Sequence, residues 1–179
     1  MEDKVLVVID MQNDFVTGAL KNAEAEKIVA DVAAKVGEYV NKGIPVFFTR
    51  DTHDADYLGT QEGRLLPVPH CIAGTGGWQI VPGLREFVME GREGNVFDKP
   101  SFGSMYLPQW IREKLDGMPE TVEFCGVCTD ICVISNAMIM KAAFPETEVA
   151  VLGGLCAGVT PASHETALSA MESCQINIK

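Results

Sequence analysis

The chain has 179 residues, of which 47% are hydrophobic, and its 14 basic and 25 acidic side chains give a net charge of −11. This length suits one domain with a full core, which we expect to span residues 1–179. The acidic charge argues against nucleic acid or an anionic membrane as a partner. The apolar runs fall short of the about 20 residues of a membrane helix, and the first residues lack signal-peptide features, so we expect a cytoplasmic protein.

The predicted elements alternate between strands and helices along the chain. A β-branched run over 4–9 is typical of a strand buried on both faces, and helical periodicity follows from Ala23 to Asn41, with Gly43 as a stop. Residues 50–77 show no sustained period and form a long loop, which in compact domains is usually functional. Further strands are expected at 44–49, 95–98, 122–125, 148–152 and 175–178, and further helices at 83–90, 107–115, 130–144 and 163–174.

This alternation predicts an α/β fold of the doubly wound, three-layer α/β/α type, with a six-stranded parallel sheet covered by helices on both faces. In such sheets ligands bind beyond the carboxyl ends of the strands, near the point where strand order reverses. Polar residues follow four of the predicted strands, namely Asp10, Thr49 to His53, Asp98-Lys99 and Cys132. An acid, a base and a thiol at one sheet edge predict a catalytic crevice.

The segment 122–133 begins as an apolar strand, breaks at Gly126 and continues as a helix, with Thr129 and Asp130 as capping residues. Cys132 falls in the first helical turn, where the helix N-terminus is expected to lower the pKa of its thiol. On this segment alone, Cys132 is either a nucleophile or a small buried core residue. The convergence of the strand ends favours the nucleophile.

Six cysteines are present, and reduced thiols are expected because a cytosolic domain of this size does not need disulfides. Cys125 and Cys128 form a C-x-x-C sequence, which could be a redox dithiol or half of a zinc site. Cys125, however, lies inside the predicted strand, and the sequence holds no second C-x-x-C. Both alternatives are therefore disfavoured.

A cysteine nucleophile needs a proton acceptor, and none of the histidines follows a strand end in a way that marks it as the base. Asp10 can serve as the base if it is buried beside a cation such as Lys99, which would also stabilise the thiolate. The backbone amides of Cys128 and Cys132 can hold an oxyanion. The alternative is an ordinary Asp10–Lys99 ion pair without a catalytic role.

The long loop holds a second cluster of polar residues. Asp51 and His53 lie two residues apart on an extended segment, so their side chains point the same way. Glu62 and His70 follow in the same loop. Carboxylates with two imidazoles suit one divalent ion (Zn, Fe or Mn) and leave positions open for water or substrate. Solvated loop residues remain the alternative explanation for this cluster.

Three segments resemble the motifs of the isochorismatase-like cysteine hydrolases. Val8 to Phe15 resembles the opening motif of that family, Lys99 to Phe102 its lysine motif, and Gly126 to Val133 its nucleophile motif. The resemblance runs from Lys4 to about the last strand. It implies a six-stranded doubly wound fold and a catalytic triad of Asp10, Lys99 and Cys132. It also implies a cis peptide bond between Val127 and Cys128, which turns the Cys128 amide into the oxyanion hole.

Within that family, Asp51, His53 and His70 resemble the metal site of nicotinamidases, and Glu62 matches a further ligand of some members. The resemblance implies a metal-assisted cysteine amidohydrolase that converts nicotinamide to nicotinate and ammonia through a thioester on Cys132. It also implies a small-molecule amide substrate and a homo-oligomer, a dimer or a tetramer. The alternatives are another small amide or ureido substrate, or a non-catalytic binding member.

Aromatic residues are expected to sandwich the substrate ring, with Phe15, Trp78 and Tyr106 as candidates by similarity and by aromatic packing. For each of them, a place in the core is the alternative, and taken singly it is the commoner one. Cys128 departs from the family pattern, in which a small residue such as Ala or Ser is more familiar. The departure leaves the amide of this residue in place and adds a thiol.

Overall fold

The computed structural model describes residues 3–179. One parallel sheet runs through it, with the strand order β3-β2-β1-β4-β5-β6. This confirms the predicted six-stranded α/β fold. The strands are β1 (Lys4–Ile9), β2 (Val46–Asp51), β3 (Val96–Lys99), β4 (Thr121–Val127), β5 (Glu148–Ala157) and β6 (Asn177–Ile178).

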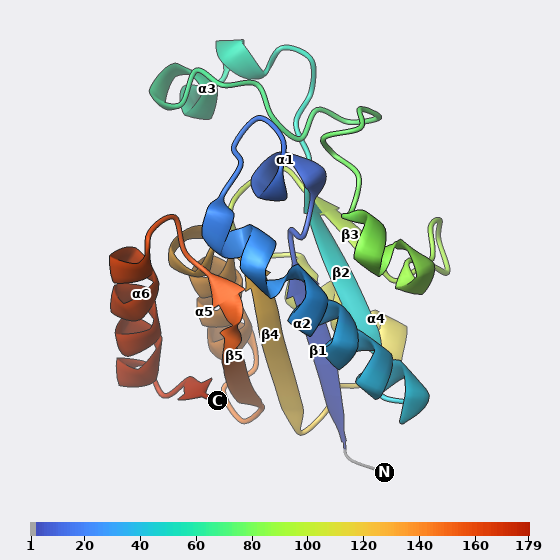
Figure 1. Ribbon diagram of the computed structural model, residues 1–179. Coiled ribbons are helices and arrows are strands. Elements are labelled where there is room, and N and C mark those ends of the chain that lie inside the picture. The colour runs from blue at the N-terminus through green and yellow to red at the C-terminus, as the bar shows by residue number, and fades with distance from the viewer. Residues whose placement is uncertain (1–2) are drawn as a thin grey trace.

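Helices cover both faces of the sheet. Figure 1 shows α2 over one face and α4 and α5 over the other, where α4 packs against α5 and α5 against α6. Among residues 3–179, no helix combines the length and the apolar character needed to cross a bilayer. The helices are α1 (Asn13–Val16), α2 (Ala23–Asn41), α3 (Gln61–Leu65), α4 (Leu107–Leu115), α5 (Ile134–Ala143) and α6 (Pro161–Ser173), with 3₁₀ turns η1 (Tyr57–Gly59) and η2 (Pro82–Phe87) and a π-helical segment η3 (Thr129–Val133).

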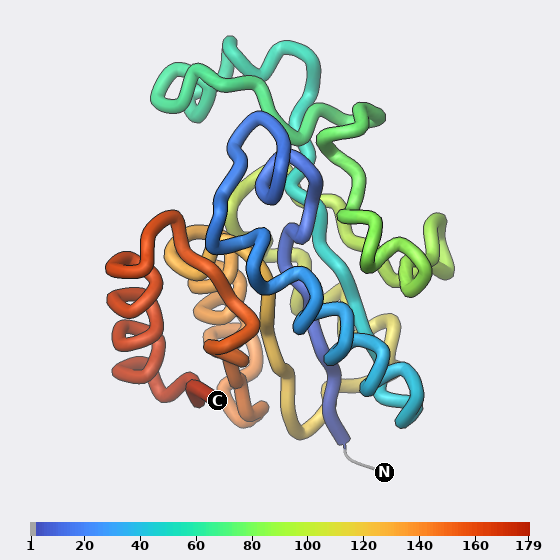
Figure 2. Tube along the Cα trace, in the orientation of Figure 1, coloured from blue at the N-terminus to red at the C-terminus, as the bar shows by residue number. Residues whose placement is uncertain are grey.

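Strand β1 lies at the centre and pairs with β2 on one side and β4 on the other. The chain winds outward from β1 through β2 to β3 and then returns to the far side of β1, so the strand order reverses between β1 and β4. Crevices at such a reversal are the usual ligand sites of doubly wound sheets. Figure 2 shows that the chain between β2 and η2 arches over this end of the sheet.

Several predicted boundaries are wrong for identifiable reasons. The long loop contains η1 and α3, which are too short to show a helical period. Strand β5 continues to Ala157, beyond its predicted end at residue 152. Gly153 and Gly154 are poor strand formers and interrupt the apolar run, which hid the fact that the residues after them still pair with β4. The predicted helix over 83–90 is the 3₁₀ turn η2, and the one over 130–144 begins as the π-helical segment η3.

Candidate active site

The three side chains of the predicted triad meet beyond the carboxyl ends of their strands. Asp10 follows β1, Lys99 ends β3, and Cys132 lies on η3 after β4. The Lys99 ammonium Nζ is 2.6 Å from Asp10 Oδ2 and 3.6 Å from Cys132 Sγ. Asp10 and Lys99 are fully buried, and Cys132 is 5% exposed. A carboxylate, a cation and a thiol therefore lie together with little exposed surface.

The backbone at Asp10 turns as the strand ends. Its φ of 48° lies in the left-handed region, which non-glycine residues seldom adopt and which clusters at functional sites. Thr49 fixes the carboxylate, because its hydroxyl donates to Asp10 Oδ1 at 2.6 Å and accepts from the Asp10 amide at 3.2 Å. The sequence placed Thr49 among the polar residues at the end of a predicted strand. It did not predict that Thr49 would hydrogen-bond to Asp10.

The electrostatics of the thiol differ from the expectation. Burial raises the pKa of Cys132 well above the usual value, the Asp10 charge adds to the rise, and Lys99 offsets only part of it. The expectation of a lowered pKa is therefore wrong, because desolvation of the thiolate outweighs the helix terminus. Burial also raises the pKa of Asp10, against the opposing effect of Lys99. Burial and the Asp10 charge therefore both favour the protonated form of the thiol, and the neighbouring carboxylate is placed to accept its proton.

The oxyanion loop, defined here as residues 126–133, joins β4 to α5. Gly126 has a φ of 110°, and a Cβ there would lie 2.2 Å from the carbonyl oxygen of Ile9, so only glycine fits. The Val127–Cys128 peptide is cis, as the resemblance implied. Cys128 and Cys132 both line the same cavity.

The predicted capping roles of Thr129 and Asp130 are wrong. Cys128 precedes η3 without a side-chain cap, and both polar side chains bond to the segment that follows β5. The Thr129 hydroxyl lies 2.8 Å from His164 Nδ1, and Asp130 Oδ1 accepts from the Val159 amide at 3.0 Å. The loop is thus braced against the start of α6 rather than capped internally.

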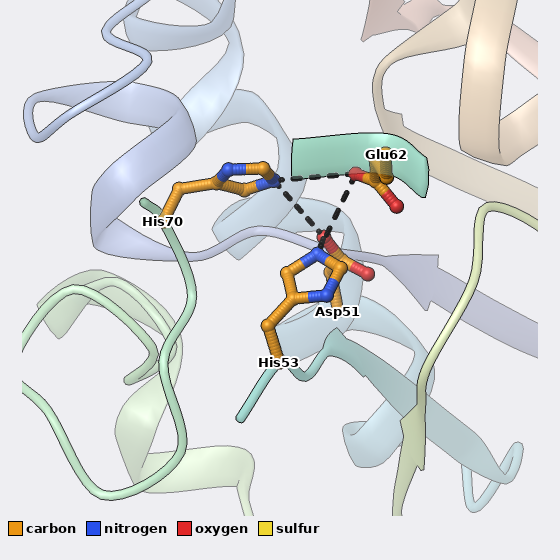
Figure 3. A group of neighbouring side chains, drawn as sticks. All are labelled: Asp51, His53, Glu62 and His70. Carbon is orange, nitrogen blue, oxygen red and sulfur yellow. Dashed lines mark hydrogen bonds and ion pairs between the residues drawn. The ribbon is translucent and has the colours of Figure 1, made fainter. Parts of the chain in front are cut away.

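The predicted metal ligands converge on one another, as Figure 3 shows, and Asp51 Oδ1 lies 3.7 Å from Lys99 Nζ of the triad. One donor atom from each of Asp51, His53, Glu62 and His70 lies within 4.8 Å of the other three. His53 Nε2 is 3.0 Å from Asp51 Oδ2 and 3.6 Å from Glu62 Oε1. His70 Nε2 is 3.5 Å and 3.8 Å from the same two oxygens. Two imidazoles and two carboxylates can therefore share one centre.

The donor set fits a divalent ion chemically. The ring of His70 is oriented by a 2.8 Å contact of Nδ1 with the carbonyl of Val68, which leaves Nε2 facing the cluster, the outer-shell arrangement common to metal-binding histidines. Burial alone would raise the pKa of Asp51, but its hydrogen bonds to His53 and His70 hold that pKa below the usual value. Among residues 3–179, Asp51 Oδ1 is buried without a hydrogen bond, 3.7 Å from Lys99 Nζ.

A cavity of about 630 Å³ opens over these groups. Its lining includes Cys132, Cys128 and three of the metal-cluster residues, Asp51, Glu62 and His70. Such a volume is within the range of small-molecule sites, about 300–1,000 Å³. The cavity continues past Cys132 to a wall that the sequence did not predict, made by Leu20–Glu24 and Val159–Pro161.

Of the three aromatic candidates, the structure brings only Phe15 to this cavity, where its ring centroid lies 5.7 Å from that of His70. Trp78 is held elsewhere, because its indole donates to Thr52 at 2.8 Å and its ring lies 3.6 Å from the Arg50 guanidinium. Tyr106 is 78% exposed at the start of α4 and, like Trp78, is not among the residues that line the cavity.

Two buried amide side chains support the site and were not predicted. Gln12 bonds both the amide and the carbonyl of Asp51, at 2.8 and 2.9 Å. Asn136 donates to the Cys132 carbonyl at 2.8 Å and accepts from the Ser104 amide at 3.1 Å. In the sequence, each of them appears only as a polar residue next to or within an apolar segment. That signal does not identify the group to which the side chain hydrogen-bonds.

Comparison with known proteins places this geometry in a family. The isochorismatase domain model matches residues 4–178. Nicotinamidase 1 of Arabidopsis thaliana is 30% identical over an alignment of 144 residues that covers 72% of this chain and 56% of the plant protein, so the chain spans little more than half of that relative. An uncharacterized isochorismatase family protein of Bacillus subtilis (strain 168), PncA, is 32% identical over 75% of this chain and 76% of its own length.

Solved structures agree with this assignment. The nicotinamidase/pyrazinamidase PncA of Bacillus subtilis superposes with a TM-score of 0.83 at 28% identity, covering 99% of both chains. A pyrazinamidase of Pyrococcus horikoshii, crystallised in complex with zinc, gives a TM-score of 0.78 at 29% identity, covering 99% of this chain and 98% of its own. The chain belongs to the isochorismatase family of hydrolases.

Proposed function

We propose that this protein is a metal-assisted cysteine amidohydrolase that converts nicotinamide to nicotinate and ammonia. The observation that carries the proposal is the position of Lys99 between Asp10 and Cys132, at 2.6 and 3.6 Å, with Cys132 lining a cavity. The names of the relatives, nicotinamidase and pyrazinamidase, support a ring carboxamide as substrate.

In the acylation step, Cys132 Sγ attacks the amide carbon while Asp10 accepts the thiol proton. The charge that develops on the carbonyl oxygen would be held by the amides of Cys128 and Cys132. The carbon–nitrogen bond then breaks, and Asp10 returns the proton to the leaving nitrogen, so that ammonia departs and a thioester remains. Lys99 stabilises the carboxylate and the developing thiolate throughout the step.

In the deacylation step, a water molecule attacks the thioester carbon and gives a proton to Asp10. The carbon–sulfur bond breaks, the acid product leaves, and the proton on Asp10 returns to the sulfur of Cys132. The site is restored without any net change in its protons. Burial of the pair raises the pKa of both groups, which suits a proton that moves between them.

Asp51, His53, Glu62 and His70 would hold one divalent ion beside the triad; Zn, Fe and Mn all accept this donor set. When bound, the ion supplies an anchor for the pyridine nitrogen, which aims the amide at the thiol. Lys99 Nζ lies 3.7 Å from Asp51 Oδ1, so this ion pair links the metal cluster to the triad. Phe15 would pack against the substrate ring from the cavity wall.

Ammonia release from nicotinamide tests the proposal. Turnover should disappear in Cys132→Ala and persist in Cys174→Ala, a control that removes an exposed thiol near the end of the chain. Cys128→Ala should also turn over, because it keeps the backbone amide. Loss of activity in Cys128→Ala with retention in Cys132→Ala would overturn the assignment of the nucleophile. A wild-type enzyme inactive on nicotinamide but active on a ureido compound would favour the alternative substrate class.

A further inference from the structure

The cavity is larger than a single-ring amide requires. Nicotinamide has nine non-hydrogen atoms, and even at about 30 Å³ for each, the liquid volume of a water molecule, it fills about 270 Å³. This is less than half of the about 630 Å³ available. The remaining space is therefore a feature of the site that hydrolysis of nicotinamide leaves unused.

The sheet order locates this unused space. The metal cluster begins at the end of β2, whereas the unused wall is made by Leu20–Glu24 and Val159–Pro161, on the β5 side. The oxyanion loop follows β4, which separates β5 from β1 and β2. A ring between the metal cluster and Cys132 would thus occupy the β2 half of the cavity. We call the other half the β5-side lobe.

The β5-side lobe is preformed by hydrogen bonds. Asn22 Nδ2 donates to the carbonyl of Gly158 at 2.7 Å, which ties the start of α2 to the segment before α6. The Val159 amide donates to Asp130 Oδ1 at 3.0 Å, which ties that segment to the oxyanion loop. The lobe is therefore fixed relative to the nucleophile, and a group bound in it would hold a constant position relative to Cys132.

The walls of the cavity are apolar and still exposed to water. In the lobe, Val159 is 55% exposed, and Leu20, Ala23 and Pro161 line it as well; the exposed side chains of Phe102 and Leu66 line the cavity outside the lobe wall. Burial of such surface gains about 25 cal/mol per Å². Lys21 and Glu24 also line the lobe, and their opposite charges give this pair a net formal charge of zero.

We infer that the β5-side lobe is a substrate subsite, and that the preferred substrates are ring carboxamides carrying an uncharged apolar extension rather than nicotinamide alone. This inference rests on the proposed function. In a pyridine-3-carboxamide whose nitrogen is held at the metal cluster, ring carbons 4 and 5 are the free positions not adjacent to that nitrogen. The extension would enter the lobe from one of these two carbons.

The test uses two series of pyridine-3-carboxamides, with hydrogen, methyl, ethyl, propyl and butyl at carbon 4 or at carbon 5. In at least one series, kcat/KM for ammonia release by the metal-loaded wild-type enzyme should rise about fourfold for each added carbon. Val159→Ser should reduce the butyl-to-hydrogen ratio of kcat/KM by about threefold. Val40→Ser, which alters a 47% exposed valine outside the cavity lining, should keep that ratio.

The outcomes separate the two proposals. If nicotinamide is hydrolysed but kcat/KM is flat or falls along both series, the subsite inference is wrong and the proposed function stands. A rise that Val159→Ser leaves intact also overturns the inference, because the extension then binds elsewhere. If no member of either series releases ammonia, the proposed function fails and the inference falls with it.

Discussion

Removal of the buried cation by Lys99→Met should destabilise the fold as well as stop catalysis. The ammonium is fully buried, 2.6 Å from Asp10 and 3.7 Å from Asp51. At an effective dielectric constant of about 20, the attraction across 2.6 Å is about 6 kcal/mol, against desolvation of several kcal/mol for each ion. Methionine leaves the buried Asp10 carboxylate without its cation, so the free energy of unfolding should fall by about 3–5 kcal/mol.

Urea denaturation of the wild-type and variant proteins measures this loss, and a double-mutant cycle identifies its cause. Asp10→Asn added to Lys99→Met removes the carboxylate that the first change left unpaired. The double variant should therefore be more stable than the sum of the two single losses allows, with a coupling of about 2 kcal/mol or more. A Lys99→Met protein that unfolds within 1 kcal/mol of the wild type, or a coupling near zero, would refute this account of the ion pair.

Three further outcomes are expected. Gly126→Ala should lower the free energy of unfolding by about 3 kcal/mol in urea, because its Cβ would meet Ile9 at 2.2 Å, whereas Gly154→Ala, with nothing within 4 Å, should not. The pKa of Tyr39 is raised to about 12 by burial and by the hydrogen bond of its hydroxyl to Glu123. About 2–3 kcal/mol of the free energy of unfolding that is present below pH 10 should therefore be lost by pH 12. The Tyr39→Phe variant should not show this loss. Elemental analysis should find about one divalent ion per chain, lost in His53→Ala and kept in His164→Ala; a metal-free, fully active enzyme would contradict the anchoring role.

The sequence predicted the elements whose signal is local and long. The run Lys4–Ile9 and the periodic stretch Ala23–Asn41 have the predicted bounds, because a buried parallel strand and an amphipathic helix each impose their own period. Shorter elements such as α3 were missed, since five residues cannot display a helical period. The predicted bounds of β5 were too short, because its glycines are poor strand formers and its pairing with β4 is visible only in the folded chain.

The site could be predicted in its chemistry but not in its energetics. Strand ends of a parallel sheet meet at one edge, so the juxtaposition of Asp10, Lys99 and Cys132 followed from topology. The pKa of Cys132 did not, because it depends on how completely the thiol is buried, which is a tertiary property. Trp78 was misplaced for a similar reason, since its partner Arg50 is visible only in the folded chain.

The measurement that tests the central claim most directly is the mass of the intact enzyme after rapid acid quench during turnover of nicotinamide. The expected result is a gain of one nicotinoyl group per chain, mapped by peptide digestion to Cys132, absent from Cys132→Ala and released as nicotinate when the enzyme is left to turn over. An acyl group on Cys128 instead, or rapid ammonia release by Cys132→Ala, would contradict an attack by the thiol that Asp10 and Lys99 surround.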